Sequence, residues 1–186
     1  MIRTRALSTP LSAEDAAGLR AGDVLYLTGT LYTAREEAHQ RLLDDLDAGL
    51  PEPFPLEGAV IYYVGPSPMT QHRPIGAAGP SSASRMDPYA PRLHQLGVRA
   101  SIGKGRRLPL MRAALMEHGG VYLGATGGAG ALLSLCIRQV RLAAYPELGP
   151  EAVYALDVAE FPLVVLQDCH GADMHVAPNL EAALSG

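Results

Sequence analysis

Short apolar segments recur along the sequence, and turn residues bound each of them. The clearest are Val24–Leu27, Ala59–Val64 and Val121–Leu123. Short apolar runs between turn signals are typical of buried strands. Strands of this kind need other layers to cover the sheet, so this feature restricts the fold more than any other.

The segments between these strands carry apolar residues at helical spacing. Ala34, Ala38, Leu42 and Leu46 mark one such helix, which ends at Gly49. Further strands are predicted at Val98–Ile102, Val140–Ala144, Ala152–Val158 and Pro162–Gln167. Helices that alternate with strands in the middle of the chain, with strands clustered at the end, predict a three-layer α/β domain with a mixed sheet. A doubly wound nucleotide-binding fold is the alternative.

The composition limits the classes of protein to which the chain can belong. With 186 residues, 48% of them hydrophobic, we expect a single globular domain over 1–186 that ends in a short tail at 176–186. The formal charge of −4 argues against a nucleic-acid-binding protein. No apolar run approaches the roughly 20 residues of a membrane span. The two cysteines, Cys136 and Cys169, suit a reducing cytoplasm.

The glycine-rich stretch Gly124–Gly130 invites comparison with nucleotide-binding loops, because glycines let backbone amides approach a pyrophosphate. Its spacing departs from the G-x-G-x-x-G pattern. The expected acidic residue at a strand end is also missing, since Glu147 follows a proline in a turn. We therefore interpret the stretch as a tight turn between a strand and a helix.

The segment Cys169–His175 contains cysteine, histidine and aspartate, which are residue types that ligate metals. A zinc site normally needs four ligands, or three with a paired spacing. The segment follows a strand and contains a glycine, as the tip of a hairpin does. We therefore predict no metal site in this chain.

Three cationic side chains lie where predicted strands meet predicted helices. Arg35 falls in the first turn of a helix, where the helix dipole disfavours a cation unless an anion binds there as well. Arg85 follows Ser81 in a serine-rich loop that opens another helix, and Lys104 lies between two glycines at a strand exit. Together they favour a small anionic ligand with two charged ends. An ion pair for Arg35, N-capping by a serine and a solvated lysine are the alternatives.

These segments belong to a longer series of motifs. In chain order the motifs are Gly22–Arg35, Ala38–His39, Ile75–Ser82, Ser84–Asp87, Ile102–Gly105, His118–Tyr122, Gly127–Gly128, Tyr145–Gly149 and Asp157–Pro162. The series resembles, in the same order, the β subunit or C-terminal domain of class I iron–sulfur fumarate hydratases, in the tartrate/fumarate hydro-lyase family. The resemblance covers roughly residues 7 to 175.

The resemblance implies a swivelling β/β/α domain and the reversible hydration of fumarate to (S)-malate. It implies a [4Fe–4S] cluster that a partner, the α subunit, holds with three thiolates, so that this chain binds no cofactor and works in a hetero-oligomer. By motif, Arg35, Arg85 and Lys104 are expected to bind the substrate carboxylates. Ser81 stands where the family usually has the threonine proposed to handle the C3 proton.

Two other functions remain open at this point. A β subunit of L-tartrate dehydratase shares the architecture, and one sequence does not decide between dicarboxylate substrates. A dicarboxylate-binding protein that has kept the fold and lost turnover is the second alternative. Homodimerisation is likewise left open. The three cations argue against a loss of function, whereas the change from threonine to Ser81 would permit it.

Overall fold

A computed structural model describes residues 1–66, 75–76, 78–125 and 130–176 of the chain. The elements are β1 (Thr4–Ser8), α1 (Ala13–Gly18), β2 (Val24–Thr33), α2 (Glu36–Asp47), β3 (Val60–Tyr62), the 3-10 turn η1 (Ala83–Met86), α3 (Ala90–Gln95), β4 (Ala100–Gly103), α4 (Pro109–His118), β5 (Val121–Ala125), α5 (Gly130–Ser134), β6 (Ile137–Ala144), the 3-10 segment η2 (Pro146–Glu151) and β7 (Val153–Gln167). None of the helices in this described part is long and apolar enough to cross a membrane.

The strands form a mixed sheet in the order β1-β2-β3-β4-β5-β7-β6. Strands β1 to β5 run parallel to one another, and β7 runs antiparallel to β2, β5 and β6. Strand β7 also pairs with β2, from Val24↔Val164 to Tyr32↔Ala155. Because β7 pairs with both β2 and β5, the strands β2, β3, β4, β5 and β7 form a closed ring. The predicted α/β fold with a mixed sheet is confirmed.

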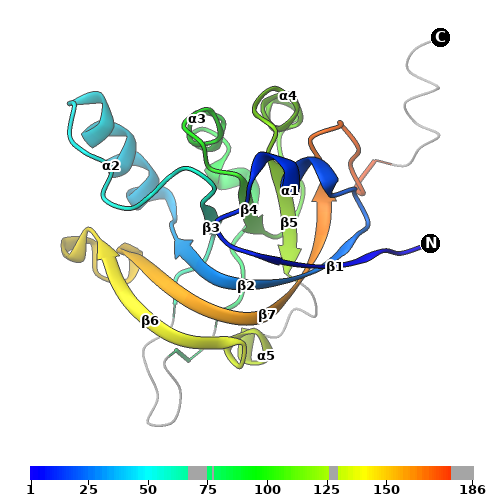
Figure 1. The fold of residues 1–186 in the computed structure, drawn as a ribbon. Coiled ribbons are helices and arrows are strands. Elements are labelled where there is room, and N and C mark those ends of the chain that lie inside the picture. Colours follow the sequence, from blue (N-terminus) through cyan, green and yellow to red (C-terminus); the bar gives the residue numbers. More distant parts are fainter. Residues whose placement is uncertain (67–74, 77, 126–129, 177–186) are drawn as a thin grey trace.

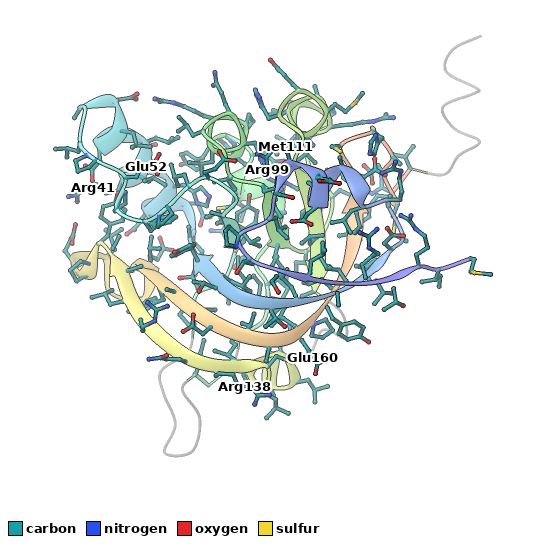
Figure 2. The ribbon with its side chains drawn as sticks, in the orientation of Figure 1. Arg41, Glu52, Arg99, Met111, Arg138 and Glu160 are labelled. Atoms are coloured by element: carbon teal, nitrogen blue, oxygen red, sulfur yellow. The ribbon has the colours of Figure 1, made fainter. Side chains whose placement is uncertain are left out.

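Both faces of the central strands are buried, as the apolar runs indicated. In β3 and its flank, Val60 and Tyr62 pack inside the ring, whereas Ile61 and Tyr63 pack into a second core against the helices. The helices α2, α3 and α4 line one side of the molecule, and the long strands β2, β7 and β6 curve along the other (Figure 1). Figure 2 shows Met111 and Arg99 on the helix side, and Arg138 and Glu160 on the strand side.

Strand β2 is longer than predicted. The sequence indicated an end at Gly29, but the strand continues to Thr33 past a bulge between Leu27 and Gly29. Gly29 has φ +124°, and a Cβ there would lie 2.2 Å from Thr9 Oγ1. A glycine that usually ends a strand therefore serves here as a bulge residue against a neighbouring segment.

Two other boundaries differ from the prediction, and one strand was not predicted. The two strands expected at 152–158 and 162–167 are one strand, β7, which continues through Glu160 at φ 50°. The helix expected up to Ile137 ends at Ser134, and Ile137 begins β6. Strand β1 has no apolar run, because it pairs only with β2 at the edge of the sheet, and the sequence did not indicate it.

Candidate substrate site

Arg35 connects β2 to α2. It is the N-cap residue of α2 rather than a first-turn residue as predicted, and its side chain makes no capping hydrogen bond. Its Nε lies 3.8 Å from Glu36 Oε2, and its Nη2 lies 3.6 Å from Glu151 Oε1. These distances exceed hydrogen-bond length, and Arg35 Nε and Glu36 Oε2 are both buried without a hydrogen-bond partner. The guanidinium therefore has unused donor capacity inside the site.

The backbone after β3 gives the Arg35 guanidinium its space. A Cβ on Gly65 would lie 2.8 Å from Arg35 Nη1, so only glycine allows the side chain to lie against this turn. On the other side, His39 fixes the backbone of Arg35. The Arg35 carbonyl oxygen accepts a hydrogen bond from His39 N at 3.0 Å and contacts His39 Nδ1 at 2.7 Å. Arg35 is thus held at its backbone, and Gly65 leaves room for its side chain.

Ser81 and Arg85 lie on the segment that leads through η1. The Ser81 amide donates to the Tyr63 carbonyl at 2.6 Å, which continues the course of β3. Arg85 is 56% exposed at its side chain, and its Nη2 lies 2.5 Å from Glu36 Oε1. The helix predicted after the serines is a 3-10 turn here, and Ser82, its N-cap, makes no side-chain capping bond. The N-capping alternative is therefore not observed.

Lys104 follows β4 and is bound to the Ser81 segment through the backbone. Its amide donates to the Ser81 carbonyl at 3.1 Å, and its carbonyl accepts from the Ala83 amide at 2.9 Å. Close approach of the two segments depends on Gly103, because a Cβ there would lie 2.9 Å from the Ala83 Cβ. The Lys104 side chain is exposed and has no ion pair with another described residue.

A cavity of about 310 Å³ opens beside Lys104. Its walls are small or apolar, and consist of Gly103, Gly105, Gly124, Ala125, Val164 and Leu166 together with Lys104 itself. The lining is thus mostly small or apolar, and it includes one cation. This combination suits a small molecule that has a short carbon skeleton and charged ends.

The four residues predicted from the sequence come from three segments, and the structure brings them into one region. Glu36 joins Arg35 to Arg85, and backbone hydrogen bonds join Ser81 to Lys104. With Glu36 and Glu151 included, three cations and two carboxylates leave a net positive charge. The Ser81 hydroxyl makes no hydrogen bond with another described residue. The arrangement can bind a dianion and offer it a hydroxyl.

Sequence reasoning missed the acidic partners and the support of this site. It gave an ion pair for Arg35 only as an alternative, and it assigned no role to Asp87 or Arg107. Asp87 and Arg107 form an ion pair whose two side chains are fully buried. The one available signal was the position of Asp87 in the Ser84–Asp87 motif, which gives no information about its partner.

The two cysteines do not form a metal-binding set. Cys136 lies between α5 and β6, whereas Cys169 follows β7 and its Sγ lies 3.9 Å from the Ala16 carbonyl oxygen. Burial raises the pKa of the Cys169 thiol, which disfavours the thiolate that ligates metals. Within the described ranges, no three Cys, His, Asp or Glu side chains are grouped to hold a metal ion. These residues therefore do not fit a [4Fe–4S] cluster.

The fold and the site together define a mixed-sheet α/β domain that brings three cationic side chains and a serine into one region. Comparison with known proteins identifies its family. Residues 3–177 match the family described as fumarase C-terminus. The chain belongs to this family, as the motifs predicted.

The curated relatives are hydro-lyases by name. The chain is 38% identical over 178 residues to a putative class I fumarate hydratase of Geobacillus stearothermophilus, covering 93% of this chain and 34% of that protein. It is 39% identical over 151 residues to the anaerobic class I fumarate hydratase of Escherichia coli, covering 80% and 28%. The chain thus spans about a third of the length of these fumarate hydratases.

A third relative has nearly the same extent as this chain. It is named putative L(+)-tartrate dehydratase subunit beta and comes from Methanocaldococcus jannaschii. The identity is 34% over 175 residues, which cover 91% of this chain and 90% of that protein. Relatives with two different substrate names therefore share this domain.

Proposed function

We propose that this chain is the β subunit of an iron–sulfur hydro-lyase that hydrates fumarate reversibly to (S)-malate. The observation that carries the proposal is the gathering of Arg35, Ser81, Arg85 and Lys104 from three distant segments into one region. These positions were chosen from sequence motifs, and the Glu36 bridge and the Ser81–Lys104 backbone bonds link them in space. The order of the sequence motifs and the gathering of these residues both support a class I fumarate hydratase domain with a cationic site.

Each side chain has a role that its chemistry supports. Arg35 and Arg85 present guanidinium forks, which bind a carboxylate through paired hydrogen bonds. Lys104, whose amide donates to the Ser81 carbonyl, adds a compact charge. When the proton at C3 leaves, negative charge builds on the adjacent carboxylate, and fixed cations stabilise that charge. Nearby cations also favour the alkoxide form of Ser81, so its hydroxyl oxygen is the proposed proton acceptor at C3.

The proposed enzyme needs a second chain or domain. The fumarate hydratases that match are about three times as long as the matched region, and this chain lacks the thiols to hold a cluster. The partner would hold the [4Fe–4S] cluster, whose Lewis acidity would assist departure of the hydroxyl group. The M. jannaschii relative, which is a subunit by name, supports a β-subunit role. The cytoplasm is the proposed location, since it keeps such thiols and clusters reduced.

L-tartrate dehydratase is the second candidate. The name of the M. jannaschii relative, which is 34% identical over 175 residues, favours it. Tartrate carries hydroxyl groups on both central carbons, and fumarate carries none. The site residues described above bind the carboxylates that both substrates share, so the difference in substrate must be tested directly.

The test is an anaerobic assay of the chain alone and with its cluster-bearing partner, using fumarate and tartrate in parallel. Fumarate hydration that occurs only in the mixture supports the proposal. Turnover of tartrate but not of fumarate would keep the hydro-lyase function and change the proposed substrate to tartrate. A complex that turns over neither compound contradicts the hydro-lyase function.

Arg85→Ala should lower kcat/KM at least about tenfold, because a charged hydrogen bond to the substrate contributes about 1.5–3 kcal/mol. Arg92→Ala, which removes an exposed arginine paired with Asp47, is the control.

A further inference from the structure

A buried ion pair lies directly behind the candidate site. Arg107 Nε donates to Asp87 Oδ1 at 2.5 Å, and neither side chain is exposed to solvent. The second carboxylate oxygen, Asp87 Oδ2, accepts from the Leu108 amide at 2.6 Å. Asp87 thus binds both the side chain and the backbone of the segment that follows Lys104.

The other nitrogens of Arg107 are also engaged. Nη1 donates to Ser101 Oγ at 2.9 Å and Nη2 donates to the Tyr63 hydroxyl at 3.2 Å. The guanidinium carbon lies 5.3 Å from the ring centre of Tyr63 and 4.9 Å from that of Tyr122. A guanidinium with this many directed contacts has a single orientation, so it fixes the position of one segment relative to the other.

Each partner in this network also touches a segment that carries a site residue. Asp87 lies two residues after Arg85, and Arg107 lies three residues after Lys104. The Tyr63 carbonyl accepts the Ser81 amide, and the Tyr122 hydroxyl donates to the Gly105 carbonyl at 2.9 Å. The network therefore contacts both the segment that carries Ser81 and Arg85 and the segment that carries Lys104.

Stability alone does not explain the pair. Moving two charges out of water is costly, and a well-packed apolar pair of similar volume often stabilises a core as well or better. What an apolar pair lacks is direction, because hydrophobic contacts do not fix an orientation. Active sites depend on that direction, since a displacement of about 1 Å can lower a rate about 100-fold.

We propose that the Asp87–Arg107 pair is the positioning element of the site, which holds the Ser81–Arg85 segment and the Lys104 segment in register. Neither residue is placed to touch the substrate. The structural part of the proposal concerns the two segments only. Its catalytic part rests on the proposed hydro-lyase function.

The structural part is tested by amide hydrogen exchange on the full chain carrying Asp87→Asn. Asparagine has nearly the same shape and removes the charge. The amides of Ala83 and Lys104, which make the two cross-links between the segments, should exchange at least about tenfold faster. Exchange in β5 should change less. Asp23→Asn is the matched control, because it breaks the Arg3–Asp23 pair, also 2.5 Å long, at the start of β2. The control should leave the Ala83 and Lys104 amides unchanged.

The catalytic part is tested by kinetics of the complex, with rates expressed per folded molecule. Asp87→Asn should lower kcat and raise KM, for a combined loss of about 100-fold in kcat/KM, whereas Asp23→Asn should leave both parameters within about twofold. Ser101→Ala is a milder second variant that removes one acceptor from Arg107, and it decides the question if Asp87→Asn does not fold. It should produce a smaller loss of the same kind.

Unchanged exchange at Ala83 and Lys104 in both Asp87→Asn and Ser101→Ala would overturn the proposal. So would unchanged kcat and KM in an active complex that carries either variant. Faster exchange in a chain whose wild-type complex lacks activity would support the structural part and reject only the hydro-lyase function. The two hypotheses therefore fail in different experiments.

Discussion

Glu36 Oε1 lies 2.5 Å from Arg85 Nη2, so a carboxylate of the chain is already paired with one of the arginines proposed to bind the substrate. The other oxygen of the same carboxylate lies 3.8 Å from Arg35 Nε, which is too far for a hydrogen bond. Glu36 therefore lies between the two arginines and neutralises part of their charge. A substrate carboxylate that binds the same arginines must share them with Glu36 or displace it.

Removing this charge should strengthen the binding of dicarboxylates. In Glu36→Gln the site keeps its shape and loses a competing anion, so we expect the inhibition constant of a non-reacting dicarboxylate such as succinate to fall about fivefold. That factor corresponds to about 1 kcal/mol, which is the upper range for a partly exposed ion pair. Inhibition of the complex by succinate measures it.

Glu37→Gln is the matched control for this prediction. Glu37 is the next residue of α2, is exposed and makes no side-chain contact with either arginine. Both variants remove one negative charge from the same helical turn. Equal effects of the two variants would mean that general charge, and not the Glu36 bridge, controls binding.

Loss of the Ser81 hydroxyl should affect catalysis and leave binding nearly unchanged. Ser81→Ala removes the proposed proton acceptor, and such groups contribute about 100- to 10,000-fold to a rate. We expect a fall of that size in kcat with KM within about threefold, measured in the fumarate assay. Ser81→Thr should retain activity because it keeps the hydroxyl. Ser82→Ala, a change at the exposed neighbouring residue, should retain it as well. Activity of Ser81→Ala near the wild-type level would assign the proton to another group.

Gly103 sets the distance between β4 and the Ser81 segment, and a larger residue should disturb both fold and site. In Gly103→Ala the new Cβ would lie 2.9 Å from the Ala83 Cβ and 3.0 Å from Tyr63 Cδ2. Overpacking of this kind costs about 1–3 kcal/mol, so the urea midpoint should fall and kcat/KM with it. Gly79→Ala is the control, since the nearest atom to its Cβ would be 3.9 Å away. A stable, fully active Gly103→Ala would show that the segments can separate without loss.

Two buried histidines should make the chain less stable in acid. Burial lowers the pKa of His39 to about 4 and that of His94 to about 3, from 6.5. As the pH falls below 6.5 the unfolded chain binds protons that the folded chain rejects. The free energy of unfolding should therefore be highest above pH 6.5 and decrease toward pH 4, by up to about 1.4 kcal/mol per pH unit for each histidine. Urea unfolding at several pH values measures this slope.

His39→Gln separates the contribution of His39 to the pH dependence of the free energy of unfolding from the contributions of the other titrating groups. This variant removes the titrating ring that contacts the Arg35 carbonyl oxygen, and it leaves His94 in place. The slope between pH 6.5 and pH 4 should become smaller than in the wild-type chain. An unchanged slope would show that other groups, such as carboxylates, cause the acid sensitivity.

The apolar runs predicted the central strands well, because strands buried on both faces leave a local signal that few other elements leave. Ala59–Val64 is such a run, and it contains β3 with its neighbours in two cores. Strand β7 shows where this signal fails. Glu160 and Pro162 interrupt its pattern, yet pairing with β2, β5 and β6 keeps it a single strand. Pairing between distant segments overrides local propensity there.

The family, the α/β fold class and the four candidate residues could be predicted from the sequence, because motifs of fixed order preserve residue types at positions along the chain. The surroundings of these residues could be described only after the chain was seen folded. The Glu36 bridge joins Arg35 to Arg85, and the Asp87–Arg107 pair joins residues 20 positions apart. Ion pairs and buried hydrogen bonds depend on distances of a few ångströms between segments, and no local pattern in the chain records those distances.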